Sequence, residues 1–318
     1  MQATKKILVT GASGFVGSKL CQQLERQGIA HTPVARSPIS GMINVGELDA
    51  RTDWAEALQG VSDIIHLAAR VHVMNETEAD PLAAFTRVNV DATLNLARQA
   101  VASGVKRLLY VSSVKVNGEA TFDRPYTSTD TPAPEDAYGR SKHIAEQALW
   151  ALAKESGLEI VVVRPPLVYG PGVKANFRSL MQAVYRRIPL PIGSVNNLRS
   201  MVGVDNLVDL LLTAATHPRA AGHTFLASDD HDIGTADLAR ELGRAMQRPA
   251  ILVPVPVPIL RALGTLTGRS GFIDRLTGSL QVDVSPAKEI LGWSPKIGLR
   301  EGLLATTAHF ISSKHEHA

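Results

Sequence analysis

The chain has 318 residues, of which 45% are hydrophobic and 20% charged, and its formal net charge is +3. This length is sufficient for one large domain or for two smaller domains that share a core. The lysine and arginine residues form no run, which excludes the basic footprint of a nucleic-acid-binding protein.

Cysteine content and hydropathy favour a cytoplasmic protein. The single cysteine, Cys21, lies in an apolar helical pattern and cannot form a disulfide within the chain. Residues 1–6 lack the shape of a signal peptide, and apolar stretches such as residues 208–215 are too short to cross a bilayer. We therefore expect no membrane insertion, and we expect no metal site.

Short apolar runs alternate with helical patterns along the first half of the chain. Runs of this kind are typical of buried parallel strands, and the intervening patterns of amphipathic helices. The predicted strands are residues 7–10, 29–35, 61–68, 107–112 and 159–163, and the predicted helices are residues 14–27, 81–103 and 138–155. The alternation predicts an α/β protein with a doubly wound, parallel Rossmann sheet.

The alternation weakens after Gly170, where residues 171–200 are richer in Pro, Arg and Asn. Residues 204–215 predict a helix and residues 223–227 a strand, and the remainder is helical. The alternating prolines Pro254, Pro256 and Pro258 predict an extended segment that interrupts this helical region. We expect a Rossmann domain of residues 1–170 and 203–228, and a smaller, partly interleaved substrate-binding domain of residues 171–202 and 229–318.

A glycine-rich loop joins the first strand to the first helix. Gly11, Gly14 and Gly17 allow a tight turn and a close approach of the backbone to a pyrophosphate, and the helix N-terminus supplies N–H groups. The spacing is Gly-x-x-Gly-x-x-Gly and differs from the standard fingerprint. We predict a dinucleotide site at this loop, formed by Gly11, Ser13, Gly14, Phe15, Val16 and Gly17.

The end of the second strand bears on the choice between NAD and NADP. An acidic residue there binds the ribose 2′-hydroxyl, whereas a nearby arginine accommodates a 2′-phosphate. This chain has Arg36 and Ser37 and no acidic residue at that point. The sequence therefore favours NADP(H) as the cofactor, with NAD(H) as the alternative. Arg36 could instead be a solvated loop residue with no role in cofactor binding.

Tyr138 and Lys142 are four residues apart on a predicted helix and so share one face. A free tyrosine has a pKa of about 10, and a nearby ammonium favours the phenolate that general-base catalysis needs. The fourth strand ends at Ser112 and Ser113, on the edge where open α/β sheets bind ligands. We predict Ser113, Tyr138 and Lys142 as catalytic residues.

These features together resemble the extended short-chain dehydrogenase/reductase family, which comprises nucleotide-sugar epimerases, dehydratases and reductases. The resemblance covers essentially the whole chain. The matching segments are residues 11–17, 66–69, 88–90, 111–113, 138–142, 164–165, 169–172 and 291–293.

The resemblance implies roles for individual residues. Tyr138 is the acid and base, Lys142 binds the nicotinamide ribose, and Ser113 orients the sugar oxygen. It places further residues along the dinucleotide, namely Glu47, Leu48, Leu67, Ala68, Ala69, Asn89, Val111 and Pro165. It places a nucleotide-diphosphate sugar against Asn176, Arg199 and Arg275, with Lys115 facing the sugar or the solvent. It also implies a homodimer formed through the helices of residues 83–103 and 139–156.

The residues after Ser113 bear on the type of reaction. Sugar 4,6-dehydratases carry an Asp-Glu pair there to eliminate water, and this chain has Val114 and Lys115, which excludes a dehydratase. Residues 69–74 and 114–118 resemble bacterial polysaccharide (O-antigen) enzymes that reduce UDP-4-keto-6-deoxy-N-acetylglucosamine to UDP-N-acetylquinovosamine. We therefore expect a 4-keto reductase, with a UDP-sugar 4-epimerase as the alternative. A non-catalytic dinucleotide sensor is disfavoured because Tyr138 and Lys142 are both present.

Overall fold

The computed structural model describes residues 5–71 and 80–315. Residues 72–74, part of the segment 69–74 that contributed to the expected reaction, lie outside them. A seven-stranded parallel sheet in the order β3-β2-β1-β4-β5-β6-β9 forms the centre. Its strands are β1 (Ile7–Thr10), β2 (His31–Ala35), β3 (Ile43–Asn44), β4 (Asp63–His66), β5 (Arg107–Val111), β6 (Glu159–Arg164) and β9 (Thr224–Leu226). The predicted doubly wound α/β fold is confirmed.

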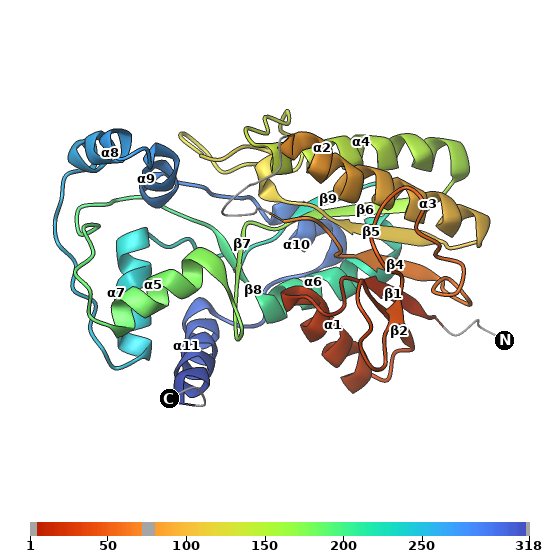
Figure 1. Cartoon of the computed structure of the whole chain (residues 1–318), viewed down its shortest axis with the longest axis horizontal. Helices are drawn as coiled ribbons and strands as arrows, with labels where there is room; N and C mark the ends of the chain where they lie inside the picture. Colours follow the sequence, from red (N-terminus) through yellow and green to blue (C-terminus); the bar gives the residue numbers. More distant parts are fainter. Residues whose placement is uncertain (1–4, 72–79, 316–318) are drawn as a thin grey trace.

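Helices cover both faces of the sheet because alternate strand residues point to opposite sides. Val9 and Ile65 belong to one core with α1, α6 and α10, whereas Leu8 and Ile64 belong to the other with α3 and α4. In Figure 1, α2 lies beside α4. The bounds are α1 (Phe15–Arg26), α6 (Val204–Thr216) and α10 (Ser285–Leu291) on one face, and α2 (Pro81–Thr86), α3 (Ala92–Ala102) and α4 (Ala137–Ser156) on the other.

The prediction of a single regular helix over residues 81–103 is wrong in one respect. A π-helical segment, Arg87–Asp91, separates α2 from α3. Asn89 lies in this segment, and its side chain bonds outside the helix, to Arg70 and Ser141. Segments of this kind are often found at functional sites, and sequence periodicity does not reveal a turn with one extra residue.

A second group of elements lies beyond the carboxyl ends of the strands (Figure 1). It has its own core, which includes Tyr169, Phe177, Met181 and Leu242. It comprises a two-stranded sheet, β7 (Leu167–Tyr169) and β8 (Met201–Gly203), and the helices α5 (Ala175–Tyr185), α7 (Thr235–Ala245), α8 (Val257–Leu266), α9 (Ser270–Thr277) and α11 (Leu299–His315). Neither β7 nor β8 was predicted, since three residues are too few for a periodic signal.

The structure corrects one prediction for the second half of the chain, the extended segment at Pro254–Pro258, and supports another, the strand at residues 223–227. Pro258 lies in the first turn of α8, where a missing N–H costs nothing, so the extended segment ends at Pro256. The predicted strand at residues 223–227 returns to the main sheet as β9, which pairs in parallel with β6. In the part of the chain that the structure describes, no helix combines the length and apolar character needed to span a membrane.

Candidate active site

The first turn of α4 places Tyr138 beside the end of β5. Asp136 caps this helix, and its Oδ1 accepts a bond of 2.7 Å from the N–H of Gly139. A Cβ on Gly139 would lie 2.8 Å from the carbonyl oxygen of Lys115, so glycine allows the helix to pack closely on the turn after β5. The Ser113 side chain is near enough to the Tyr138 phenol to lower the pKa of that phenol. The structure thus brings Ser113 and Tyr138 together as predicted.

Lys142 lies one turn further along α4 and is only 2% exposed. Its Nζ donates a hydrogen bond of 2.8 Å to the carbonyl oxygen of Val111, and lies 5.9 Å from the centre of the Tyr138 ring. Burial lowers the pKa of Lys142 to about 7, and the nearby Glu146 carboxylate opposes this shift. The ammonium is therefore held on the face of α4 that carries the phenol.

The pKa of Tyr138 is shifted in the opposite direction from the one expected. Burial, followed by the negative charge of Asp136, raises it to about 12, and the nearby Ser113 side chain lowers it only in part. A phenolate is poorly solvated in this environment, which includes the ring of Phe85 at 5.9 Å. With the chain's own residues alone, Tyr138 is therefore a proton donor at neutral pH.

The glycine loop leaves a backbone cradle that a side chain would fill. Gly11 has a φ of 67°, and a Cβ there would lie 2.9 Å from the backbone nitrogen of Ala68. A Cβ on Gly17 would lie 2.1 Å from the carbonyl oxygen of Gly11. Gly14 begins α1 without a side-chain cap. This arrangement fits a diphosphate, because backbone N–H groups and the positive end of the helix dipole face it without obstruction.

The residues predicted to contact the adenosine follow neighbouring strands. Arg36 and Ser37 are exposed after β2, and within residues 5–71 and 80–315 no hydrogen bond or ion pair involves the Arg36 side chain. Leu48 is buried and Glu47 exposed after β3, whose two residues pair with the end of β2. The structure therefore places both segments at one edge of the sheet.

Asn89, which is predicted to lie along the dinucleotide, also forms side-chain hydrogen bonds within the protein. Its Oδ1 accepts from the N–H of Arg70 at 2.8 Å, and its Nδ2 donates to the Arg70 carbonyl at 3.0 Å and to the Ser141 hydroxyl at 2.9 Å. The Ser141 hydroxyl in turn donates to the Tyr138 carbonyl. Asn89 thus ties the segment after β4 to the helix turn between Tyr138 and Lys142.

The four residues predicted to bind substrate are placed in different ways. Lys115 Nζ forms ion pairs with Glu119 at 2.7 Å and with Asp136 at 2.5 Å, so its ammonium is engaged by two carboxylates. Arg199 donates to the backbone carbonyls of Arg275 and Gly278, which brings the two predicted arginines together. Burial lowers the pKa of Arg199, and the charge of Arg275 contributes.

The structure also shows the positions of two other predicted residues, Asn176 and Pro165. Asn176 is exposed in the first turn of α5. Pro165 is buried directly after β6, and its carbonyl accepts a bond of 3.0 Å from the N–H of Val114.

The sequence prediction missed Asp136, which caps α4, bears on the pKa of Tyr138 and pairs with Lys115. An Asp just before the start of a predicted helix is a capping signal that could have indicated it.

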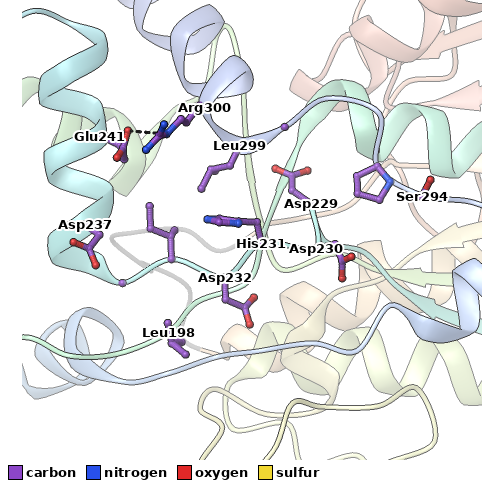
Figure 2. Close-up of a pocket in the computed structure, with 14 residues that line it drawn as sticks. Leu198, Asp229, Asp230, His231, Asp232, Asp237, Glu241, Ser294, Leu299 and Arg300 are labelled. Carbon is purple, nitrogen blue, oxygen red and sulfur yellow. Dashed lines mark ion pairs between the residues drawn. The ribbon is translucent and has the colours of Figure 1, made fainter.

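A cavity of about 800 Å³ lies elsewhere, between the loop after β9, α7 and residues 294–300 (Figure 2). None of the predicted site residues lines it, and Figure 2 shows Glu241 paired with Arg300 at its edge. Its lining includes five carboxylates, those of Asp229, Asp230, Asp232, Asp237 and Glu241. Because the predicted catalytic and cofactor residues lie outside this cavity, we place the candidate active site at Tyr138.

Comparison with known proteins decides the family. The model of the "NAD dependent epimerase/dehydratase family" matches residues 7–227, which include the glycine loop, Ser113, Tyr138 and Lys142. The chain belongs to this family. The parallel sheet, the glycine loop after β1 and the Tyr/Lys pair on α4 agree with this membership. The protein is therefore an enzyme of the short-chain dehydrogenase/reductase type.

Individual relatives of this family member include enzymes acting on nucleotide sugars. A UDP-glucose 4-epimerase of Vibrio cholerae is 46% identical over 98% of this chain and 97% of its own length. The structure of a UDP-glucuronic acid 4-epimerase from Bacillus cereus in complex with NAD has a TM-score of 0.78 at 22% identity, covering 97% of this chain and 99% of that one, which shows the fold alone. RMD from Pseudomonas aeruginosa, complexed with NADPH, has a TM-score of 0.74 at 25% identity and covers 97% and 100%.

Proposed function

We propose that this family member is a UDP-sugar 4-epimerase that uses a bound nicotinamide dinucleotide. The observation that carries the proposal is the 46% identity, over nearly the full length of both chains, to a UDP-glucose 4-epimerase. The 4-keto reductase expected from residues 69–74 and 114–118 is less well supported than this alternative. The glycine cradle and the Tyr/Lys pair serve either reaction equally.

A 4-epimerase oxidises the sugar at C4 and then reduces the ketone on its other face. A dinucleotide held at the glycine loop would supply hydride transfer and, in its oxidised form, a positively charged ring. Tyr138 would take the proton of the 4-hydroxyl and return it, with Ser113 orienting the reacting oxygen. Because burial raises the pKa of Tyr138 to about 12, the positive charges of Lys142 and of the nicotinamide are needed to make the phenol a base.

The substrate would lie between Tyr138 and the second group of elements. We assign its diphosphate to Arg199 and Arg275. The Arg199 guanidinium donates a hydrogen bond to the backbone carbonyl of Arg275, which keeps the two residues near each other. Asn176 is the third proposed contact, and Lys115 would approach the sugar only by leaving a carboxylate partner. Two expectations stay predictions. The first is the division into a domain of residues 1–170 and 203–228 and one of residues 171–202 and 229–318. The second is a homodimer formed through the helices of residues 83–103 and 139–156.

The proposed reaction is tested with purified protein and UDP-glucose or UDP-N-acetylglucosamine, without added cofactor. We expect interconversion with the corresponding galacto sugar, because the hydride is returned in each cycle. A reaction that occurs only with a UDP-4-keto-6-deoxyhexosamine, and that consumes stoichiometric NADPH, would establish the reductase instead. Heat-denatured protein and the Tyr138→Phe variant serve as controls.

Arg36 tests the choice of cofactor. If it binds a 2′-phosphate, Arg36→Ala should weaken NADPH by about tenfold or more and leave NADH nearly unchanged, since a charged hydrogen bond contributes about 1.5–3 kcal/mol. Dissociation constants from the fluorescence of each reduced dinucleotide measure this. Arg240→Ala, an exposed arginine on α7, is the matched control. An equal effect on NADH and NADPH would remove Arg36 from cofactor discrimination.

A further inference from the structure

His66, the last residue of β4, is buried between two threonines and is only 2% exposed. Its Nδ1 lies 2.7 Å from the hydroxyl of Thr10, at the end of β1, and its Nε2 lies 2.8 Å from the hydroxyl of Thr93, in α3. None of the roles assigned above uses this side chain. It nevertheless joins the strand that precedes the glycine loop to the helix that follows the π-helical segment.

The bonds of Thr10 determine which nitrogen of His66 carries the proton. The Thr10 hydroxyl oxygen accepts from the N–H groups of Leu67 at 3.2 Å and Ala68 at 3.1 Å. Its single proton is therefore free to go to Nδ1 of His66, which must accept, and Nε2–H donates to Thr93. The ring is neutral in this arrangement, and burial together with Lys142 lowers the pKa of His66 to about 3.

The turn fixed by Thr10 is the one that lies against the glycine loop. A Cβ on Gly11 would be 2.9 Å from the backbone nitrogen of Ala68, so the two backbones are in close contact. One face of the His66 ring stacks on the Tyr110 ring, with the two centroids 5.8 Å apart. Lys142 Nζ lies 4.5 Å from the centre of that Tyr110 ring. His66 therefore lies behind both halves of the proposed site without entering either.

We propose that His66 is a positioning residue which, through Thr10, holds the Leu67–Ala68 turn against the glycine loop and so preforms the dinucleotide site. The inference rests on the proposed function, because it concerns the same site. It predicts an asymmetry between the two threonines. The Thr10 bond governs the dinucleotide site, whereas the Thr93 bond only anchors the far side of the ring.

The test compares Thr10→Val with Thr93→Val, since each variant removes one buried hydroxyl bonded to His66 and little volume. We expect both to lower the melting temperature, and Thr10→Val more than Thr93→Val, because it removes the partner of three polar groups and Thr93→Val the partner of one. Only Thr10→Val should also raise the dissociation constant for NADH, by about tenfold or more. Thr10→Ser, which restores the hydroxyl, should recover the affinity. NADH fluorescence titration and thermal unfolding are the two readouts.

Equal losses of NADH affinity in Thr10→Val and Thr93→Val, or no recovery in Thr10→Ser, would overturn the inference. Because Thr10→Val also removes the acceptor of the Leu67 and Ala68 N–H groups, His66→Asn and His66→Leu test His66 itself, whether or not Thr10→Val folds. Asn keeps an acceptor near Thr10 and should bind NADH like Thr93→Val, whereas Leu should bind it weakly, and equal binding by the two would count against the inference. A wild-type protein that binds neither NADH nor NADPH would instead overturn the proposed function itself.

Discussion

Replacing Tyr138 with Phe is expected to lower turnover at least about a hundredfold while leaving the affinity for the dinucleotide within about twofold. The substitution removes only the hydroxyl, which is the proposed proton carrier, and leaves Lys142 in place. A positioned acid or base contributes about 10²–10⁴-fold to a rate. Turnover is measured as interconversion of the UDP-sugar epimers, and affinity by NADH fluorescence.

Tyr185→Phe is the matched control for this variant. Tyr185 ends α5, and its ring packs edge-on against Phe310 with centroids 5.9 Å apart, away from α4. We expect it to retain full turnover. If Tyr138→Phe kept more than about a tenth of the wild-type rate, the proton would have to travel by another group, and the assignment of Tyr138 would be wrong.

The sequence reveals the position of the candidate site better than its electrostatics. Apolar runs closed by glycine or serine mark the carboxyl ends of β1 and β5, and parallel strands bring those ends to one edge. The spacing of Tyr138 and Lys142 is likewise a local property of one helix. The sign of the pKa shift at Tyr138 is not, because it depends on burial by Phe85 and on the charge of Asp136, which comes from the helix cap.

Other features that the sequence does not reveal depend on contacts between distant segments. Asn89 stays a predicted cofactor contact, and the sequence does not reveal that its amide nitrogen donates to the Arg70 carbonyl and the Ser141 hydroxyl, 19 and 52 residues away. The ion pair between Lys115 and Asp136 spans 21 residues and forms only when α4 packs on the turn after β5. The type of reaction was harder still, because an epimerase and a reductase need the same phenol, ammonium and cradle.

The ion pair between Arg164 and Glu146 gives the second large effect. Arg164, the last residue of β6, donates to both oxygens of Glu146, at 3.0 and 2.5 Å, and to Asn117 Oδ1 at 3.0 Å. The two side chains are 6% and 3% exposed. Arg164→Met should therefore lower the free energy of unfolding by about 3–5 kcal/mol, because it leaves the Glu146 carboxylate buried without its partner. Urea denaturation followed by circular dichroism measures it.

Two variants separate this effect from a loss of charge in general. Arg124→Met breaks an ion pair with Asp130 in which the arginine is 64% exposed, and should cost about 0–1 kcal/mol. The double variant Arg164→Met with Glu146→Leu should recover most of the lost stability, since an apolar pair of similar volume replaces a buried ion pair at little cost. A double variant as unstable as Arg164→Met would contradict this explanation.

The same double variant also bears on catalysis. Glu146 is one helical turn beyond Lys142 and raises the pKa of that ammonium against the effect of burial. Removing both charges of the ion pair should therefore leave a stable fold in which Lys142 is neutral over more of the pH range. Because Tyr138 depends on that ammonium to become a base, the rising limb of the pH–rate profile should move to higher pH. A stable double variant with an unchanged profile would show that Glu146 serves the fold alone.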